Sequence, residues 1–264
     1  MPDSFTRSDV VTFSEGQIMA WLSPLLWPFL RVLAMFSTAP VFSLRVIPTR
    51  AKVGFALFVS LCAQPMLAGQ PVISVNSPEA LGTAAQQVAV GMAMGFAVRV
   101  VFAALDLAGE FIGLQMGLNF AAFFDPASGG QISAVGRFFS RMVLLLFVVT
   151  NGHLLLLMAV VKSFDHFPTN GNFLESLAQM RLYELGSALF SSAFWLALPM
   201  IALLLFVNLT LGIISRVAPQ MNIFAIGFPV TLTVGLIGIA ATLPMLEQPL
   251  LSLLQLAIEI FQKP

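Results

Sequence analysis

Long runs without a single charged residue are the feature that most constrains the fold of this chain. The stretches 142–161, 185–215 and 217–246 contain no Asp, Glu, Lys or Arg. A helix of roughly 20 apolar residues is long enough to cross the hydrocarbon core of a bilayer. Membrane-spanning strands would alternate in polarity over short segments, and these runs do not alternate. The sequence therefore predicts an all-α, polytopic membrane protein.

Composition agrees with this prediction and narrows the class of partner. Of the 264 residues, 58% are hydrophobic and only 9% are charged, whereas a soluble domain has about 25% charged residues. A surface of this composition would not stay solvated in water, so membrane lipid is one expected partner. The formal net charge is zero, which argues against nucleic acid as a partner because no basic face is available to bind it.

Six apolar stretches are expected to cross the membrane, and one shorter apolar segment is expected to form a loop. The expected spans are 18–42, 53–67, 81–105, 142–161, 185–215 and 217–246. Positive residues in short connections favour the cytoplasmic side, and they gather in three such connections. These residues are Arg45, Arg50 and Lys52, then Arg137 and Arg141, and finally Arg216. The last connection predicts a cytoplasmic hairpin turn at Arg216, Pro219 and Gln220, because proline favours a tight reversal.

The stretch 81–118 is too long for an ordinary span. As one helix it would measure about 57 Å, against a hydrocarbon core of about 30 Å, so it must either break or project beyond the bilayer. Arg99, Asp106 and Glu110 fall within about 40° of one another on such a helix. They predict one polar stripe that faces protein or water rather than lipid.

Glycines at four-residue spacing lie on roughly the same side of this helix as the charged stripe. They are Gly91 and Gly95, then Gly109, Gly113 and Gly117. Small residues at this spacing let two membrane helices approach closely. The pattern predicts a helix-packing face, and it leaves open whether the neighbour belongs to a partner, to a pore or to this same chain.

The residues needed for catalysis or metal binding are sparse. His153 and His166 lack the spacing of metal ligands, and Cys62 is the only cysteine, so we expect no metal and no cofactor. Asp106 and Asp125 are the candidate aspartates for an intramembrane catalytic pair, and Asp125 precedes a proline, where a turn explains it. The protein is therefore expected not to be an enzyme.

Two sets of arginines have more than one interpretation. Arg31 is expected to extend toward a membrane interface, although it lies well inside its span. Arg137 and Arg141 share one helix face. They either anchor a helix end at lipid headgroups or line an aqueous passage, and the sequence leaves both interpretations open.

Four ordered motifs resemble one known family over residues 15–250. They are FLRVLAMFSTAPVFSLRVIPTRAKVG at 29–54, AGEFIGLQMGLNFAAFFDP at 108–126, NGHLLLL at 151–157 and RVAPQMNIFAIGFPVTLTVG at 216–235. Together they resemble the FliR family of flagellar biosynthetic proteins, whose relatives also serve virulence type III secretion. The resemblance does not by itself separate the flagellar system from the virulence system.

The resemblance implies a non-enzymatic subunit of the flagellar type III export gate, a helical assembly in the bacterial inner membrane at the flagellar basal body. Implied partners are FliP-like and FliQ-like gate subunits, FlhB-like and FlhA-like export proteins, and unfolded flagellar substrates. Residues 1–187 would be a FliP-like part that includes the loop 116–132. Residues 188–264 would be a FliQ-like C-terminal hairpin.

The same resemblance implies that the loop 116–132 plugs the closed channel. The implied plug residues are Met116, Gly117, Phe120, Ala121, Ala122, Phe123, Phe124 and Asp125. This chain has Ala127 where the family often has glycine after Asp-Pro. Flexibility is therefore expected from Ser128, Gly129 and Gly130, since alanine disfavours left-handed backbone angles.

Two alternatives belong to other functional classes. A small-solute secondary transporter would use the stripe of Arg99, Asp106 and Glu110 as a coupling site and would show inverted repeats, which the sequence lacks. An intramembrane enzyme would need Asp106 and Asp125 to act as a pair.

Overall fold

The computed structural model describes residues 15–71, 73–118, 133–170, 183–220 and 222–262. Within these ranges all regular elements are helices, which confirms the prediction of an all-α protein. The α-helices are α1 (Glu15–Thr38), α2 (Thr49–Ala63), α3 (Ala80–Gln115), α5 (Ala134–Val149), α6 (Gly152–His166), α8 (Tyr183–Val217), α9 (Ile223–Thr242) and α10 (Glu247–Glu259). Two short 3₁₀ helices, η1 (Gln64–Leu67) and η3 (Leu243–Leu246), continue α2 and join α9 to α10.

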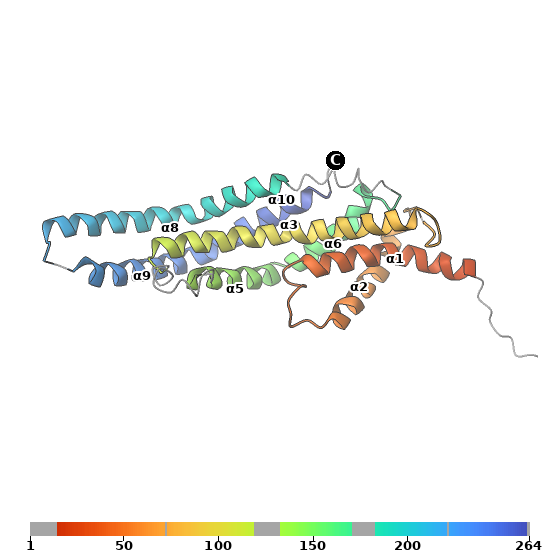
Figure 1. Cartoon of the computed structure of the whole chain (residues 1–264), viewed down its shortest axis with the longest axis horizontal. Helices are drawn as coiled ribbons and strands as arrows, with labels where there is room; N and C mark the ends of the chain where they lie inside the picture. The colour runs from red at the N-terminus through yellow and green to blue at the C-terminus, as the bar shows by residue number, and fades with distance from the viewer. Residues whose placement is uncertain (1–14, 72, 119–132, 171–182, 221, 263–264) are drawn as a thin grey trace, which may run out of the picture.

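Helix α3 is the central element of an elongated molecule. It contacts α1, α5, α8 and α10, while α2 packs on α1 and α9 packs mainly on α8. Figure 1 shows α3 running along the long axis, with the turn between α8 and α9 at one end of the molecule, beyond the end of α3. A helix that contacts neighbours on several sides is expected to be largely apolar, and α3 is largely apolar apart from a few polar residues such as Asp106 and Glu110.

The long central helix does not break. Its 36 residues correspond to a length of about 54 Å, so it exceeds the thickness of an ordinary hydrocarbon core. No proline lies within it, and a helix without proline keeps its backbone hydrogen bonds intact. Of the two possibilities that the sequence left open, a break in the helix is therefore excluded, and the continuous helix is longer than an ordinary hydrocarbon core is thick.

The expected count of about six spans is too high. In the described part of the chain, four helices are long and apolar enough to cross a membrane, or up to five if the bent pair α5 and α6 forms one span. The expected span at 53–67 corresponds to α2, whose 15 residues measure only about 22 Å. The last span is also different, because α9, η3 and α10 continue one another over Ala225–Glu259.

The expected span at 142–161 is bent between α5 and α6 by 67°. Asn151 adopts a left-handed conformation with φ 58° and ψ 26°. Asparagine is one of the few residues other than glycine that visits this region at low cost. The polar step Thr150-Asn151 therefore ends α5 and starts α6 in a new direction.

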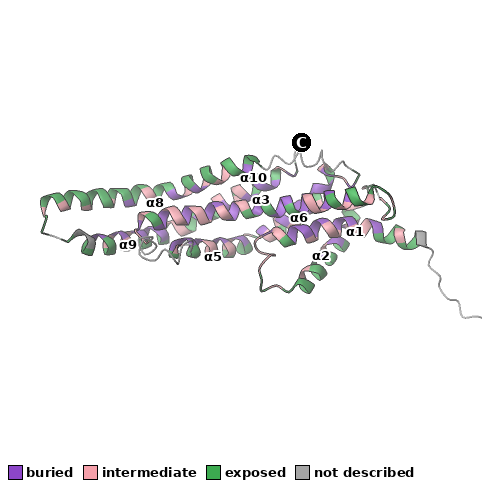
Figure 2. Cartoon of the chain, viewed as in Figure 1, coloured by how far each residue is buried: buried purple, intermediate pink, exposed green. Residues whose placement is uncertain are grey.

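Two hydrophobic cores lie at different positions along the bundle. The first is formed by α1, α3, α5, α6 and α10 around Met35, Val98 and Phe147. The second is formed by the end of α3 with α5, α8, α9 and η3. Figure 2 shows buried residues along the central helices and mostly exposed residues on the far ends of α8 and α9. The predicted boundary at 187/188 falls inside α8 and stays a prediction.

Candidate functional site at the end of helix α3

Helix α3 ends in a turn that reverses the chain at Gly117. The Gly117 N–H donates to the Leu114 carbonyl at 3.1 Å, and the Leu118 N–H donates to the Gly113 carbonyl at 3.2 Å. This pair of bonds is the Schellman motif, which requires a residue with positive φ after the helix. Gly117 has φ 79°, so its geometry explains why a glycine occupies this position.

The chain returns to the same place after residue 132. The Ser133 backbone N–H donates to Glu110 Oε1 at 2.8 Å, and the Ser133 hydroxyl accepts the Gly136 N–H at 2.9 Å as the N-cap of α5. A Cβ added at Gly113 would lie 2.9 Å from Ser133 Oγ. Gly113 therefore touches both ends of the segment 119–132. We call Gly113, Met116, Gly117, Leu118 and Ser133 the loop base.

Met116 anchors the loop base in the second core. Its side chain is fully buried, and its carbonyl lies 3.3 Å from the hydroxyl of Thr231 in α9. The position of a Cβ at Gly235 would be only 2.6 Å from Met116 Cγ. Sequence reasoning missed Thr231 and Gly235 because they are more than a hundred positions away from Met116.

The three charges of the predicted polar stripe have different surroundings. Asp106 Oδ1 accepts a hydrogen bond from the Ser140 hydroxyl at 2.6 Å, and Glu110 binds Ser133. Both carboxylates therefore face α5 and its N-cap, whereas Arg99 is exposed. In this chain two members of the stripe fix α5 against α3.

Four of the five predicted packing glycines face other helices or the N-cap of α5 in this same chain. A Cβ at Gly91 would collide with the carbonyl of Arg31, and one at Gly95 would lie 2.8 Å from the carbonyl of Met35. A Cβ at Gly109 would lie 2.9 Å from the Cβ of Phe139 in α5. Gly113 faces Ser133, as described above, and Gly117 ends the helix.

The remaining predicted residues lie partly outside the described ranges. The implied plug residues Phe120, Ala121, Ala122, Phe123, Phe124 and Asp125 fall on 119–132, as do Ser128, Gly129 and Gly130. Arg216 lies in the last turn of α8, and Pro219 and Gln220 are exposed in the turn that follows. Arg137 and Arg141 are both exposed on α5.

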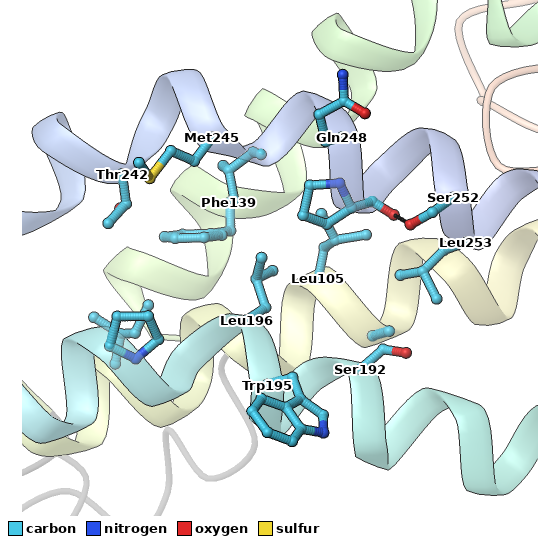
Figure 3. A pocket seen from close by; sticks show the side chains of 15 residues that line it. Leu105, Phe139, Ser192, Trp195, Leu196, Thr242, Met245, Gln248, Ser252 and Leu253 are labelled. Carbon is cyan, nitrogen blue, oxygen red and sulfur yellow. Dashed lines mark hydrogen bonds between the residues drawn. The ribbon is translucent and has the colours of Figure 1, made fainter.

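An apolar groove lies beside the loop base. Its volume is about 380 Å³, and Leu118, Val135 and Phe138 line one side while Leu232 and Leu236 of α9 line the other. A second, larger pocket of about 500 Å³ lies between α3, α5, α8 and α10. Figure 3 shows Phe139, Leu105 and Leu196 between the ribbons of α8 and α10 in this pocket.

A buried arginine forms a second polar centre at the other end of the bundle. Arg31 Nε donates to Gln87 Oε1 at 2.8 Å, Nη1 donates to Ser163 Oγ at 2.8 Å, and Nη2 donates to the Phe167 carbonyl at 2.6 Å. The guanidinium also lies 3.6 Å from the centre of the Phe164 ring. The expectation that Arg31 extends to a membrane interface is wrong, because its side chain is completely buried. The position of Arg31 well inside the apolar stretch 18–42 was the sequence feature that could have indicated its burial.

Among the described residues, no group of three or more His, Cys, Asp or Glu side chains is close enough to hold a metal ion. The polar residues near the loop base instead form hydrogen bonds that join helices. The arrangement can hold two ends of a chain segment together, and its chemistry is that of packing and capping.

Comparison with known proteins identifies the family. A family model described as bacterial export proteins, family 1, matches residues 22–257. The flagellar biosynthetic protein FliR of Escherichia coli (strain K12) is 46% identical over 233 residues, which are 88% of this chain and 89% of that protein. FliR of Pectobacterium carotovorum subsp. carotovorum is 41% identical over 239 residues, 90% of each chain. FliR of Bacillus subtilis (strain 168) is 30% identical over 234 residues, 88% of this chain and 90% of that protein. The chain therefore belongs to family 1 of the bacterial export proteins, together with the flagellar biosynthetic FliR proteins.

Proposed function

We propose that the chain is a non-enzymatic subunit of the flagellar type III protein export gate. In this proposal it forms part of the channel, and its loop 116–132 seals the channel when closed. The observation that carries the proposal is the loop base, where Leu118 and Ser133 both adjoin Gly113. A segment whose two ends are held together extends from one fixed point, which is what a plug attached to a rigid wall requires.

The length and composition of the segment 119–132 suit a seal. A chain spans at most about 3.3–3.6 Å per residue, so half of this segment going out and half returning reaches about 23–25 Å at most. That distance is enough to reach across a channel but not to cross a bilayer and return. Phe120, Phe123 and Phe124 supply apolar bulk, and a hydrophobic constriction closes a pore by excluding water.

Partners would cover the apolar surface that the isolated chain leaves open. Four large apolar residues of α8 are each more than 60% exposed: Phe190, Trp195, Phe206 and Leu209. Large exposed apolar surfaces mark protein or membrane contacts. FliP-like and FliQ-like gate subunits and membrane lipid are the proposed neighbours. FlhB-like and FlhA-like export proteins are the proposed wider partners, and unfolded flagellar subunits are the proposed substrates. The proposed location is the inner membrane at the flagellar basal body.

The plug is tested by ion leakage in cells that express the complete gate. Deletion of residues 120–124 removes the apolar tip, and we expect membrane conductance to rise above that of the unaltered gate. A triple variant with Phe120→Ser, Phe123→Ser and Phe124→Ser keeps the loop length and tests the apolar character alone. Recovery of the purified complex must be equal in all three strains. Unchanged conductance in both variants would exclude the plug.

A small-solute secondary transporter is not favoured. Its proposed coupling site loses support because Asp106 and Glu110 are engaged with Ser140 and Ser133. Uptake of a solute by proteoliposomes that contain only this chain would support the transporter. An intramembrane enzyme would require Asp125, so continued export by an Asp125→Ala variant would exclude that function.

A further inference from the structure

Helix α9 reaches the loop base through one compact contact. The Thr231 hydroxyl is buried and lies 3.3 Å from the Met116 carbonyl, and it shares its single hydrogen with the carbonyls of Gly227 and Phe228 in its own helix. The Met116 carbonyl therefore lies against α9, beside a hydroxyl whose shorter contacts, at 3.1 Å, are to carbonyls of its own helix.

The side chain of Met116 fits against a helix surface that has no side chain. Three of its atoms, Cγ, Sδ and Cε, lie 2.6–2.7 Å from the position that a Cβ would take at Gly235. Real Cβ atoms do not come this close to other atoms, so any larger residue at 235 would force Met116 or α9 to move. Because Met116 is fully buried, its side chain has little free space into which it could move.

The rest of α9 is only loosely attached near the loop. The groove of about 380 Å³ separates Leu232 and Leu236 of α9 from Val135 and Phe138 of α5. The main neighbour of α9 is α8. A displacement of α9 would therefore act on the loop base at Met116, and Met116 directly precedes the two residues whose N–H groups close the turn at the end of α3.

We propose that the contact of Met116 with Thr231 and Gly235 is a positioning latch for the loop, and that α9 must separate from Met116 for export. The inference rests on the proposed plug function and adds a means of regulating the plug. In the closed gate, α9 holds the loop base in place. Thr231 and Gly235 are positioning residues, because they act on the loop through Met116.

A reversible cross-link tests whether the latch must open. Met116→Cys and Gly235→Cys are combined in a Cys62→Ser background, since Cys62 is the only native cysteine. Met116 Cγ is 2.6 Å from the Gly235 Cβ position and roughly 1.5 Å from its own Cβ. The two Cβ atoms are thus no more than about 4 Å apart, which suits a disulfide. The double variant is expressed as full-length chain in the complete gate.

Oxidation of the double variant is expected to abolish export of flagellar subunits while ion leakage stays low, and reduction is expected to restore export. Each single-cysteine variant under the same oxidant gives the baseline. Undiminished export by the cross-linked gate would overturn the latch. Two thiols that stay free after oxidation would overturn it as well, because the contact would then be absent from the assembled gate.

A second pair of variants tests the closed state. Gly235→Ala pushes against Met116, whereas Gly238→Ala pushes against Met200 of α8, where a Cβ would lie 2.6 Å from the methionine Sδ. Both changes disturb α9 packing, so both are expected to lower the melting temperature of the complex. Only Gly235→Ala is expected to raise ion leakage. Equal leakage in the two variants would overturn the latch.

The two proposals fail in different ways. If deletion of residues 120–124 causes leakage and Gly235→Ala does not, the plug stands and the latch is overturned. If neither the deletion nor the triple serine variant causes leakage, the plug itself is overturned.

Discussion

The carboxylate of Glu110 accepts a hydrogen bond from the backbone N–H of Ser133 at 2.8 Å. This bond joins α3 to the first residue after the segment 119–132, and Ser133 in turn caps α5. A carboxylate near a helix N-terminus is also favoured by the helix dipole. One side chain therefore fixes both the return of the chain and the start of the next helix.

Replacement of Glu110 is expected to loosen the loop base. Glu110→Ala removes the charged acceptor of a hydrogen bond, an interaction that contributes about 1.5–3 kcal/mol, and it should raise ion leakage through the gate. Glu110→Gln keeps an acceptor oxygen but loses the charge, so an intermediate effect is expected. The measurements are the membrane conductance of cells that express the complete gate and the melting temperature of the purified complex. Glu79→Gln, an exposed carboxylate at the other end of α3, is the control. If all three variants behave alike, Ser133 does not depend on Glu110.

Two glycines of α3 should respond differently to the same substitution. Gly91→Ala places a Cβ against the backbone carbonyl of Arg31 and 3.0 Å from Ala34 Cβ, so α1 and α3 must move apart. Gly82→Ala meets nothing within 4 Å and gains up to about 1 kcal/mol of helix propensity. We expect a clear fall in melting temperature for Gly91→Ala and no fall for Gly82→Ala. Equal melting temperatures would contradict the close packing of α1 on α3.

Hydropathy and glycine spacing could predict much of this fold. The uncharged runs predicted the helices, and the length of the stretch 81–118 indicated a helix that exceeds the bilayer. Hydropathy could not separate a span from a short apolar helix, because the apolar stretch 53–67 lies mostly in α2, whose 15 residues are too few to cross. Hydropathy also could not predict the direction of the chain at this point: the sequence has a polar step at Thr150 and Asn151, but the bend follows from the left-handed conformation of Asn151.

The contacts that build the site were harder to predict. Gly117 fits both a packing pattern and a helix end, and only its φ of 79° separates the two. Thr231 and Gly235 approach Met116 across a sequence separation of about 115 residues, and no local pattern encodes such a pair. The sequence suggested an interfacial position for Arg31. Its actual acceptors, on Gln87, Ser163 and Phe167, come from distant helices and the end of α6, and no local sequence pattern indicates them.

Arg31→Lys is expected to destabilise the chain although it keeps the positive charge. A lysine ammonium cannot reproduce the planar arrangement of donors that reaches Gln87, Ser163 and the Phe167 carbonyl. Each buried acceptor left without a donor costs about 1–3 kcal/mol. Thermal melting and recovery of the complex measure the loss. Arg99→Lys, an exposed arginine on α3, is the matched control and should be close to neutral. A neutral Arg31→Lys variant would mean that the hydrogen bonds of Arg31 contribute little.

The bend between α5 and α6 depends on the left-handed conformation of Asn151, with φ 58°. Glycine adopts this conformation without strain, so Asn151→Gly should keep the melting temperature of the complex nearly unchanged. Asn151→Ala should lower it, since a Cβ in this region costs roughly 1–2 kcal/mol, and Asn151→Val should lower it further because its side chain is β-branched. Asn151 is exposed, so loss of side-chain packing cannot account for such a series. If glycine destabilises the complex as much as valine does, the left-handed backbone conformation is not what asparagine provides at this position.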